Sequence, residues 1–202
     1  MKLPFIHLNL RFNPFGELTL EQRKEVAIVD THSLKKSLNK KSVAIQLLAD
    51  HGRGKTTYLF SLHKEYSSAP YIKIQVGDKP RFSPCAIRFV DSVENMTKKS
   101  RIDLYKKSDS LAFTTHADLS KELIKHGFTV ITKKISTADE STLMKIFSRR
   151  IRYAQRSEGE VPRINLQAIK KLQRIYKDDV RAMESHLYEK IQKLKGIENV
   201  EV

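Results

Sequence analysis

Hydrophobic positions fall into short continuous runs in the first two thirds of this 202-residue chain, and into helical spacing in the last third. Residues 42–49 form the most continuous run, Ser-Val-Ala-Ile-Gln-Leu-Leu-Ala. Such a run is typical of a strand that is buried on both faces. Shorter runs, each of which predicts a further strand, follow at 71–76, 86–90, 111–115 and 129–135.

Helical patterns alternate with these runs. Residues 55–66 predict a helix directly after the first strand, because Leu59, Phe60 and Leu62 give it an apolar side. Further helices are expected near 92–107 and 118–126. The alternation predicts an α/β fold, a three-layer sandwich with a mostly parallel sheet.

One connection is shorter than this pattern requires. Nine residues, Gly77 to Cys85, join the second and third runs, whereas a parallel crossover usually needs a dozen or more. We therefore expect the edge strand at this place to be antiparallel.

The last third of the chain is helical in pattern. A helix is expected over about 138–157, followed by a turn at Ser157–Pro162. Beyond the turn, apolar residues recur at spacings of three and four, namely Ile164, Leu166, Ile169, Leu172, Val180, Met183, Leu187, Ile191 and Leu194. We expect a core domain over residues 1–160 and a small helical lid over 161–202.

A glycine-rich segment between the first strand and its helix carries the clearest chemistry. Gly52, Gly54, Lys55 and Thr56 match the end of the phosphate-loop pattern Gly-x-x-x-x-Gly-Lys-Ser/Thr, with Ala49 in place of its first glycine. Glycines let successive backbone amides face a phosphate, the lysine reaches the β and γ phosphates, and the hydroxyl of Thr56 holds Mg²⁺. The alternative is a glycine-rich turn with a chance Lys-Thr pair, but the flanking strand and helix favour a loop that binds ATP through residues 52–57, including Arg53 and Thr57.

Acidic residues after the third run complete this hypothesis. Asp91 ends the run 86–90, where a carboxylate can hold Mg²⁺ together with Thr56. Ser92 follows it. Glu94 could orient the attacking water only if the chain turns helical at once and points the carboxylate back; otherwise it is a solvated residue in a first helical turn.

The run 111–115 ends in two threonines. We expect the hydroxyl of Thr115 to contact the γ-phosphate or the attacking water. The competing interpretation is that Thr114 and Thr115 are ordinary β-branched strand residues. His116 is assigned no catalytic role.

The order of these motifs resembles that of the AAA+ ATPases, most closely the compact branch with the TniB transposition, ExeA secretion and origin-recognition ATPases. The resemblance implies that Asn13, Pro14 and Phe15 lie near the adenine and that Arg181, in Tyr176-Lys-Asp-Asp-Val-Arg181, reaches the nucleotide from the lid. It implies catalytic roles for Lys55, Asp91 and Thr115. Ser92 stands where that family has glutamate, which puts hydrolysis in question.

Charge adds a candidate partner. Lys and Arg number 38 against 23 Asp and Glu, a net charge of +15, which favours a polyanion such as nucleic acid. Lys145, Arg149, Arg152 and Arg156 form a stripe on the helix expected over 138–157. No helix-turn-helix or zinc signature is present, so we expect DNA binding with little sequence preference. The alternatives are RNA as the polyanion and a basic face that is only solvated.

Two further features of the sequence indicate the cellular compartment. Cys85 is the single cysteine, which fits a reducing compartment. No segment approaches the roughly 20 apolar residues of a membrane span, and the N-terminal residues lack a cleavage pattern, so we expect a cytoplasmic protein.

The leading functional hypothesis is an AAA+-like ATPase or ATP-dependent switch that acts with DNA and with a partner protein or further copies of itself. The alternative is a nucleotide-bound adaptor that does not hydrolyse ATP. A P-loop kinase for a small molecule is a third possibility, on analogy of fold alone.

Overall fold

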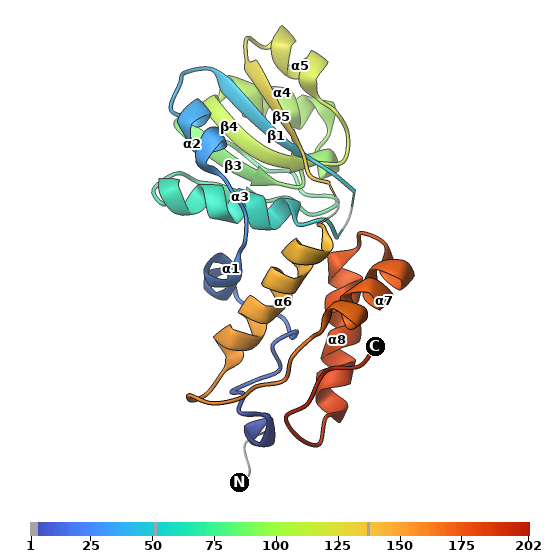
Figure 1. Ribbon diagram of the computed structural model, residues 1–202. Helices are drawn as coiled ribbons and strands as arrows, with labels where there is room; N and C mark the ends of the chain where they lie inside the picture. Colours follow the sequence, from blue (N-terminus) through green and yellow to red (C-terminus); the bar gives the residue numbers. More distant parts are fainter. Residues whose placement is uncertain (1–3, 51, 137) are drawn as a thin grey trace. The chain divides into compact units, whose positions relative to one another are not determined.

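The computed structural model describes residues 4–50, 52–136 and 138–202. Contacts divide the chain into two compact units (Figure 1). Val29–Ser136 is called the sheet unit, and Met1–Ile28 together with Thr137–Val202 is called the helical unit. The division expected at residue 160 falls inside the helical unit, because the N-terminal segment and the helix before residue 160 share a core with the C-terminal helices.

The sheet unit contains the α/β fold that the sequence predicts. Its five strands lie in the spatial order β2 (Tyr71–Lys73), β3 (Cys85–Asp91), β4 (Ser108–Thr115), β1 (Val43–Leu48) and β5 (Thr129–Lys134). Every neighbouring pair is parallel. The carboxyl ends of all five strands therefore meet at one edge of the sheet.

The prediction of an antiparallel edge strand is wrong. β2 pairs with β3 in parallel, with Lys73 opposite Asp91. Because β2 ends at Lys73, eleven residues remain before β3 begins at Cys85. These eleven residues must run back along β3 from the level of Asp91 to Cys85, a distance of about 20 Å for six residues at roughly 3.3 Å each. Eleven extended residues span more than 20 Å, so the parallel connection needs no helix.

Helices cover both faces of the sheet, which gives the expected three layers (Figure 1). α2 (His32–Leu38) and α3 (Lys55–His63) pack on one face, and α4 (Lys98–Lys106) and α5 (Ser120–Lys125) on the other. The helix expected over 92–107 is interrupted: a short 3₁₀ helix, η3 (Val93–Asn95), precedes α4. A second 3₁₀ turn, η2 (Lys64–Tyr66), extends α3.

Side chains alternate between the two faces as a period of two requires. In β1, Ile45 and Leu47 pack on the face of α2 and α3, whereas Ala44 packs on the opposite face. Gln46 shares the side of Ala44, where its amide nitrogen lies 2.7 Å from Asp118 and its carbonyl accepts from the Leu119 amide. Hydrogen bonds from Ser120 and Gln46 lower the pKa of Asp118 to about 2. This polar network attaches the start of α5 to β1.

The helical unit has a core of its own. It comprises η1 (Ile6–Leu8), α1 (Leu20–Val26), α6 (Glu140–Ala154), α7 (Leu166–Tyr176) and α8 (Val180–Lys193). Buried residues of α6, among them Phe147 and Ile151, pack with Leu172 of α7, Leu187 of α8 and Leu10 of the N-terminal segment. In the described parts of both units, no helix has the length and apolar content needed to cross a membrane.

Arg150 of α6 fastens the N-terminal segment into this unit. Its Nε donates to the Pro14 carbonyl at 2.7 Å, and one terminal nitrogen donates to the Gly16 carbonyl at 2.8 Å. The other terminal nitrogen pairs with Glu184 of α8 at 2.6 Å, and the guanidinium lies over the Phe15 ring. Burial raises the pKa of Glu184, and the charge and hydrogen bond of Arg150 oppose that shift. The ionised form of Glu184 is therefore stabilised by its pairing with Arg150.

Replacing Arg150 by Ala is expected to lower the free energy of unfolding by about 3 kcal/mol, because it removes the ion-pair partner of the partly buried Glu184 and the donors to the Pro14 and Gly16 carbonyls. Denaturant unfolding at neutral pH measures the change. Arg152→Ala, an exposed arginine of the same helix, is the control and should change stability by less than about 0.5 kcal/mol. Equal losses in the two variants would show that Arg150 has no special structural role.

Candidate nucleotide-binding site

The glycine-rich segment lies where the sequence predicts it, between β1 and α3. Gly52 and Gly54 have φ of 76° and 86°, in the left-handed region that favours glycine. A Cβ at Gly54 would meet no atom within 4 Å, so the backbone conformation rather than crowding requires glycine there. Ala49 is not among the described non-glycine residues with positive φ, so its methyl group causes no strain. His51 of this segment lies outside the described residues.

Lys55 is the first residue of α3, and its side chain is buried against the loop. The ammonium donates to the carbonyls of Ala49 and Asp50, both at 2.7 Å. It also lies 3.4 Å from each ring nitrogen of His116. Arg53 pairs with Asp50 at 3.0 Å. Thr57 lies in the first turn of α3, where backbone N–H groups have no acceptor within the helix, so the end of the helix can bind an anion.

Asp91 joins three elements at the end of β3. Its carboxylate is buried and accepts hydrogen bonds from the hydroxyl of Thr56, at 3.1 and 3.2 Å, and from the hydroxyl of Thr114, at 2.6 Å. The Ser92 amide donates to the same Thr114 oxygen at 2.7 Å. A hydroxyl and a carboxylate side by side form an oxygen donor set of the kind that Mg²⁺ takes, with substrate phosphates completing the shell.

The sequence did not single out Thr114 for this place, although strand periodicity could have done so. Thr114 lies two residues from Ala112, which packs on the α3 face, and Asp91 lies two residues from Phe89, which packs there too. Thr115 projects to the other face. Its hydroxyl bonds the backbone of Ala117, donating to the carbonyl at 2.8 Å and accepting from the amide at 3.1 Å. A contact of Thr115 with the γ-phosphate stays a prediction.

The chain turns sharply after Asp91. Ser92 has φ of 67°, in the left-handed region, and η3 begins with the next residue. The turn brings the Glu94 carboxylate to 3.1 Å from Nε2 of His116, which directly follows β4. Glu94 is therefore not a freely solvated residue of a first helical turn. His116, for which the sequence predicts no catalytic role, lies between Glu94 and Lys55.

Four residues assigned by resemblance lie in the helical unit. Asn13 is buried; its amide donates to the Tyr188 carbonyl at 3.0 Å and its side-chain oxygen accepts from the Phe15 amide at 3.1 Å. Phe15 packs edge-on against Phe147, and Pro14 supplies a carbonyl to Arg150. These contacts give the segment a structural role. Arg181 is exposed on α8. A role of these residues at the nucleotide stays a prediction.

The basic stripe on α6 is exposed at all four positions, Lys145, Arg149, Arg152 and Arg156. Two of these residues differ from the exposed helical stripe that the sequence predicts. Arg149 donates to the Glu25 carbonyl of α1 at 2.8 Å, and Arg156 lies beyond the end of α6.

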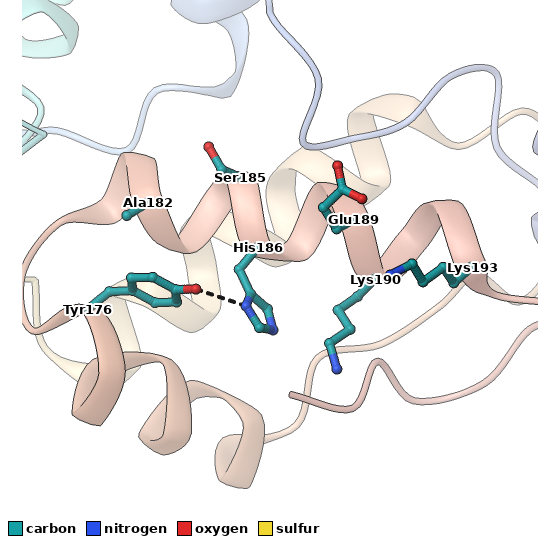
Figure 2. Close-up of a pocket in the computed structure, with 7 residues that line it drawn as sticks. All are labelled: Tyr176, Ala182, Ser185, His186, Glu189, Lys190 and Lys193. Carbon is teal, nitrogen blue, oxygen red and sulfur yellow. Dashed lines mark hydrogen bonds between the residues drawn. The ribbon is translucent and has the colours of Figure 1, made fainter.

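A hollow beside α7 and α8 is lined by residues other than those of the predicted nucleotide site. Figure 2 shows its lining residues, Tyr176, Ala182, Ser185, His186, Glu189, Lys190 and Lys193. The Tyr176 hydroxyl and Nδ1 of His186 are 2.9 Å apart. None of these residues is among those assigned to the nucleotide.

Comparison with known proteins gives matches in structure but none in sequence. No protein-family model and no curated protein matches the chain. Among solved structures, a single-residue variant of Thermotoga maritima RuvB matches with a TM-score of 0.58 and 13% identity, over 92% of this chain and 70% of that one.

A second structure of the same protein, described as the RuvB Holliday junction branch migration motor, matches with a TM-score of 0.55 and 13% identity, over 91% of this chain and 65% of that one. The chain thus spans about two thirds of the length of these structures. At this identity the likeness concerns the fold alone. With its all-parallel sheet in the order β2-β3-β4-β1-β5 and its C-terminal helices, the chain has an AAA+ ATPase-like fold resembling that of RuvB.

Proposed function

We propose that this protein binds ATP with Mg²⁺ at the loop 52–57 and acts as a slow ATPase or ATP-dependent switch together with DNA and a partner protein. The observation that carries the proposal is the cluster at the end of β3, where Thr56 and Thr114 both donate to Asp91, next to the loop that holds Lys55. Thr56 and Asp91 would hold Mg²⁺, which would neutralise charge that develops on the phosphates. Lys55 would bind the β and γ phosphates.

The alternative is an adaptor that binds nucleotide without turnover. It is motivated by Ser92, which stands where the AAA+ ATPases have glutamate. Turnover separates the two functions, because an adaptor needs the phosphate contacts but not a group that activates water.

DNA binding is supported by charge. The sheet unit carries 20 Lys and Arg against 10 Asp and Glu, and the helical unit 18 against 13. Both units would therefore attract a polyanion. Three exposed members of the stripe lie within α6, namely Lys145, Arg149 and Arg152. Arg149 already donates to the Glu25 carbonyl, so Lys145 and Arg152 are the two chosen for the test. Contacts to phosphates rather than bases fit an exposed basic stripe.

Lys55→Ala is expected to weaken binding of ATP with Mg²⁺ by about 10- to 100-fold, the effect of losing a charged hydrogen bond worth roughly 1.5 to 3 kcal/mol. Isothermal titration calorimetry measures it. Lys40→Ala, at an exposed lysine before β1, should bind as the parent does. Failure of the parent to bind ATP with Mg²⁺ would refute the proposed function.

Asp91→Asn is expected to abolish phosphate release if the protein is an ATPase, since the neutral amide cannot support Mg²⁺ as a carboxylate does. Thr114→Val should lower turnover more than Thr115→Val, because the hydroxyl of Thr114 contacts Asp91 whereas that of Thr115 bonds the backbone of Ala117. A parent that binds ATP and releases no phosphate would instead identify the adaptor. Equal effects of the two threonine changes would contradict the role given to Thr114.

Changing Lys145 and Arg152 together to Ala is expected to weaken binding to double-stranded DNA and to reduce the slope of log K against log salt by about 1.8, at roughly 0.9 per phosphate contact. Fluorescence anisotropy across a salt series measures both quantities. Lys40→Ala with Lys41→Ala removes the same charge from exposed positions in the sheet unit and is the control. An equal loss in the two pairs would mean that net charge rather than the stripe determines binding.

A further inference from the structure

We propose that Glu94 is the carboxylate that activates water for ATP hydrolysis in this protein, and that His116 is the residue that positions it. This inference rests on the proposed binding of ATP with Mg²⁺ at the loop. It assigns to the pair Glu94–His116 the work that a glutamate directly after Asp91 would otherwise do.

The first support is the path of the chain. A residue directly after Asp91 on a continuing strand would point to the face opposite Asp91. The left-handed conformation of Ser92 ends the strand, and η3 then directs Glu94 back toward the residue that follows β4. A non-glycine residue adopts this conformation at a cost, so the surrounding structure maintains the turn.

The second support is the position of His116 between Lys55 and Glu94. The ammonium of Lys55 has three hydrogens, and two of them are directed to the carbonyls of Ala49 and Asp50. The ammonium also lies 3.4 Å from both Nδ1 and Nε2 of His116, and Nε2 lies 3.1 Å from the Glu94 carboxylate. The His116 tautomer that carries its hydrogen on Nε2 can donate to Glu94. The histidine therefore connects the phosphate-binding lysine with the carboxylate.

The third support is the second oxygen of Glu94. The side chain of Glu94 is 20% exposed, yet Oε2 is buried and has no hydrogen-bond partner among the described residues. A buried carboxylate oxygen without a donor is costly, and a water molecule bound together with ATP would supply the missing donor. Glu94 thus has one oxygen held by His116 and a second oxygen without a donor among the described residues.

The proposed step uses only ATP and water. The water oxygen forms a bond to the γ-phosphorus while Glu94 accepts the proton. The bond between the γ-phosphorus and the β–γ bridging oxygen breaks, and its electron pair stays on the leaving ADP. The products are ADP and inorganic phosphate, and the proton then passes from Glu94 to solvent. His116 touches neither phosphate nor water in this step and acts by holding Glu94.

The test compares variants of the full chain in two measurements, binding of ATP with Mg²⁺ by calorimetry and phosphate release at saturating ATP, each with and without double-stranded DNA. Glu94→Gln should keep ATP binding within about threefold and lower kcat by roughly 100-fold or more, the usual contribution of a general base. His116→Leu should lower kcat by about tenfold with little change in binding, and His116→Gln, whose amide can donate to Glu94, should restore part of that loss.

Matched controls are Glu65→Gln and His32→Asn, at residues of the sheet unit exposed to solvent and outside the site. Both should behave as the parent does. Thermal unfolding of each variant separates a loss of positioning from a loss of folding, since a merely structural histidine would change the melting temperature and would not be rescued in kcat by Gln.

A parent that binds ATP but releases no phosphate, with or without DNA, would overturn the inference and leave ATP binding intact. So would a Glu94→Gln variant whose kcat stays within threefold of the parent. A parent that does not bind ATP would refute the proposed function itself, so the two failures are distinguishable.

Discussion

The parallel pairing of β4 with β1 on one side and β3 on the other is the constraint on which the site depends. It places Leu48 opposite Thr115 and Val90 opposite Phe113, so the glycine-rich loop, Asp91 and Thr114 all emerge at one edge. Because side chains alternate along a strand, a slip of one residue in this register would turn Asp91 or Thr114 away from α3. The apolar residues of β1, β3 and β4, buried on both faces by helices, prevent that slip.

Local sequence patterns were sufficient to predict the strands, the glycine-rich loop and the position of Asp91 at a strand end, because each of these features depends on consecutive residues. The direction of β2 could not be predicted in this way. β2 is parallel to β3 because an extended connection is long enough to run back along β3, and local sequence patterns do not specify that length. His116 and Glu94 are 22 positions apart in sequence, and their contact depends on a left-handed turn at a serine, for which no local residue type is diagnostic. Thr114 was within reach of sequence reasoning, had the alternation of faces been followed from Ala112.

The two units distribute polar chemistry differently. In the sheet unit, charged and polar side chains converge on the carboxyl edge of the sheet, where Asp91, Lys55 and Glu94 each have a specific partner. In the helical unit, Arg150 pairs with the partly buried Glu184 and donates to the backbone carbonyls of Pro14 and Gly16, which fixes the N-terminal segment. Charged side chains therefore gather at the edge of the sheet in one unit and hold chain segments together in the other.

The helical unit is built from two stretches of chain with the entire sheet unit inserted between them. This discontinuity has a consequence for synthesis. Residues 29–136 form a continuous unit that can complete its parallel sheet as soon as they leave the ribosome, whereas Pro14 and Gly16 must wait until Arg150 and Glu184 have been made. This segment is thus translated before the sheet unit and docks only after α6 and α8 have been made, and during that interval its apolar residues Leu8, Leu10 and Phe15 remain uncovered by their native partners.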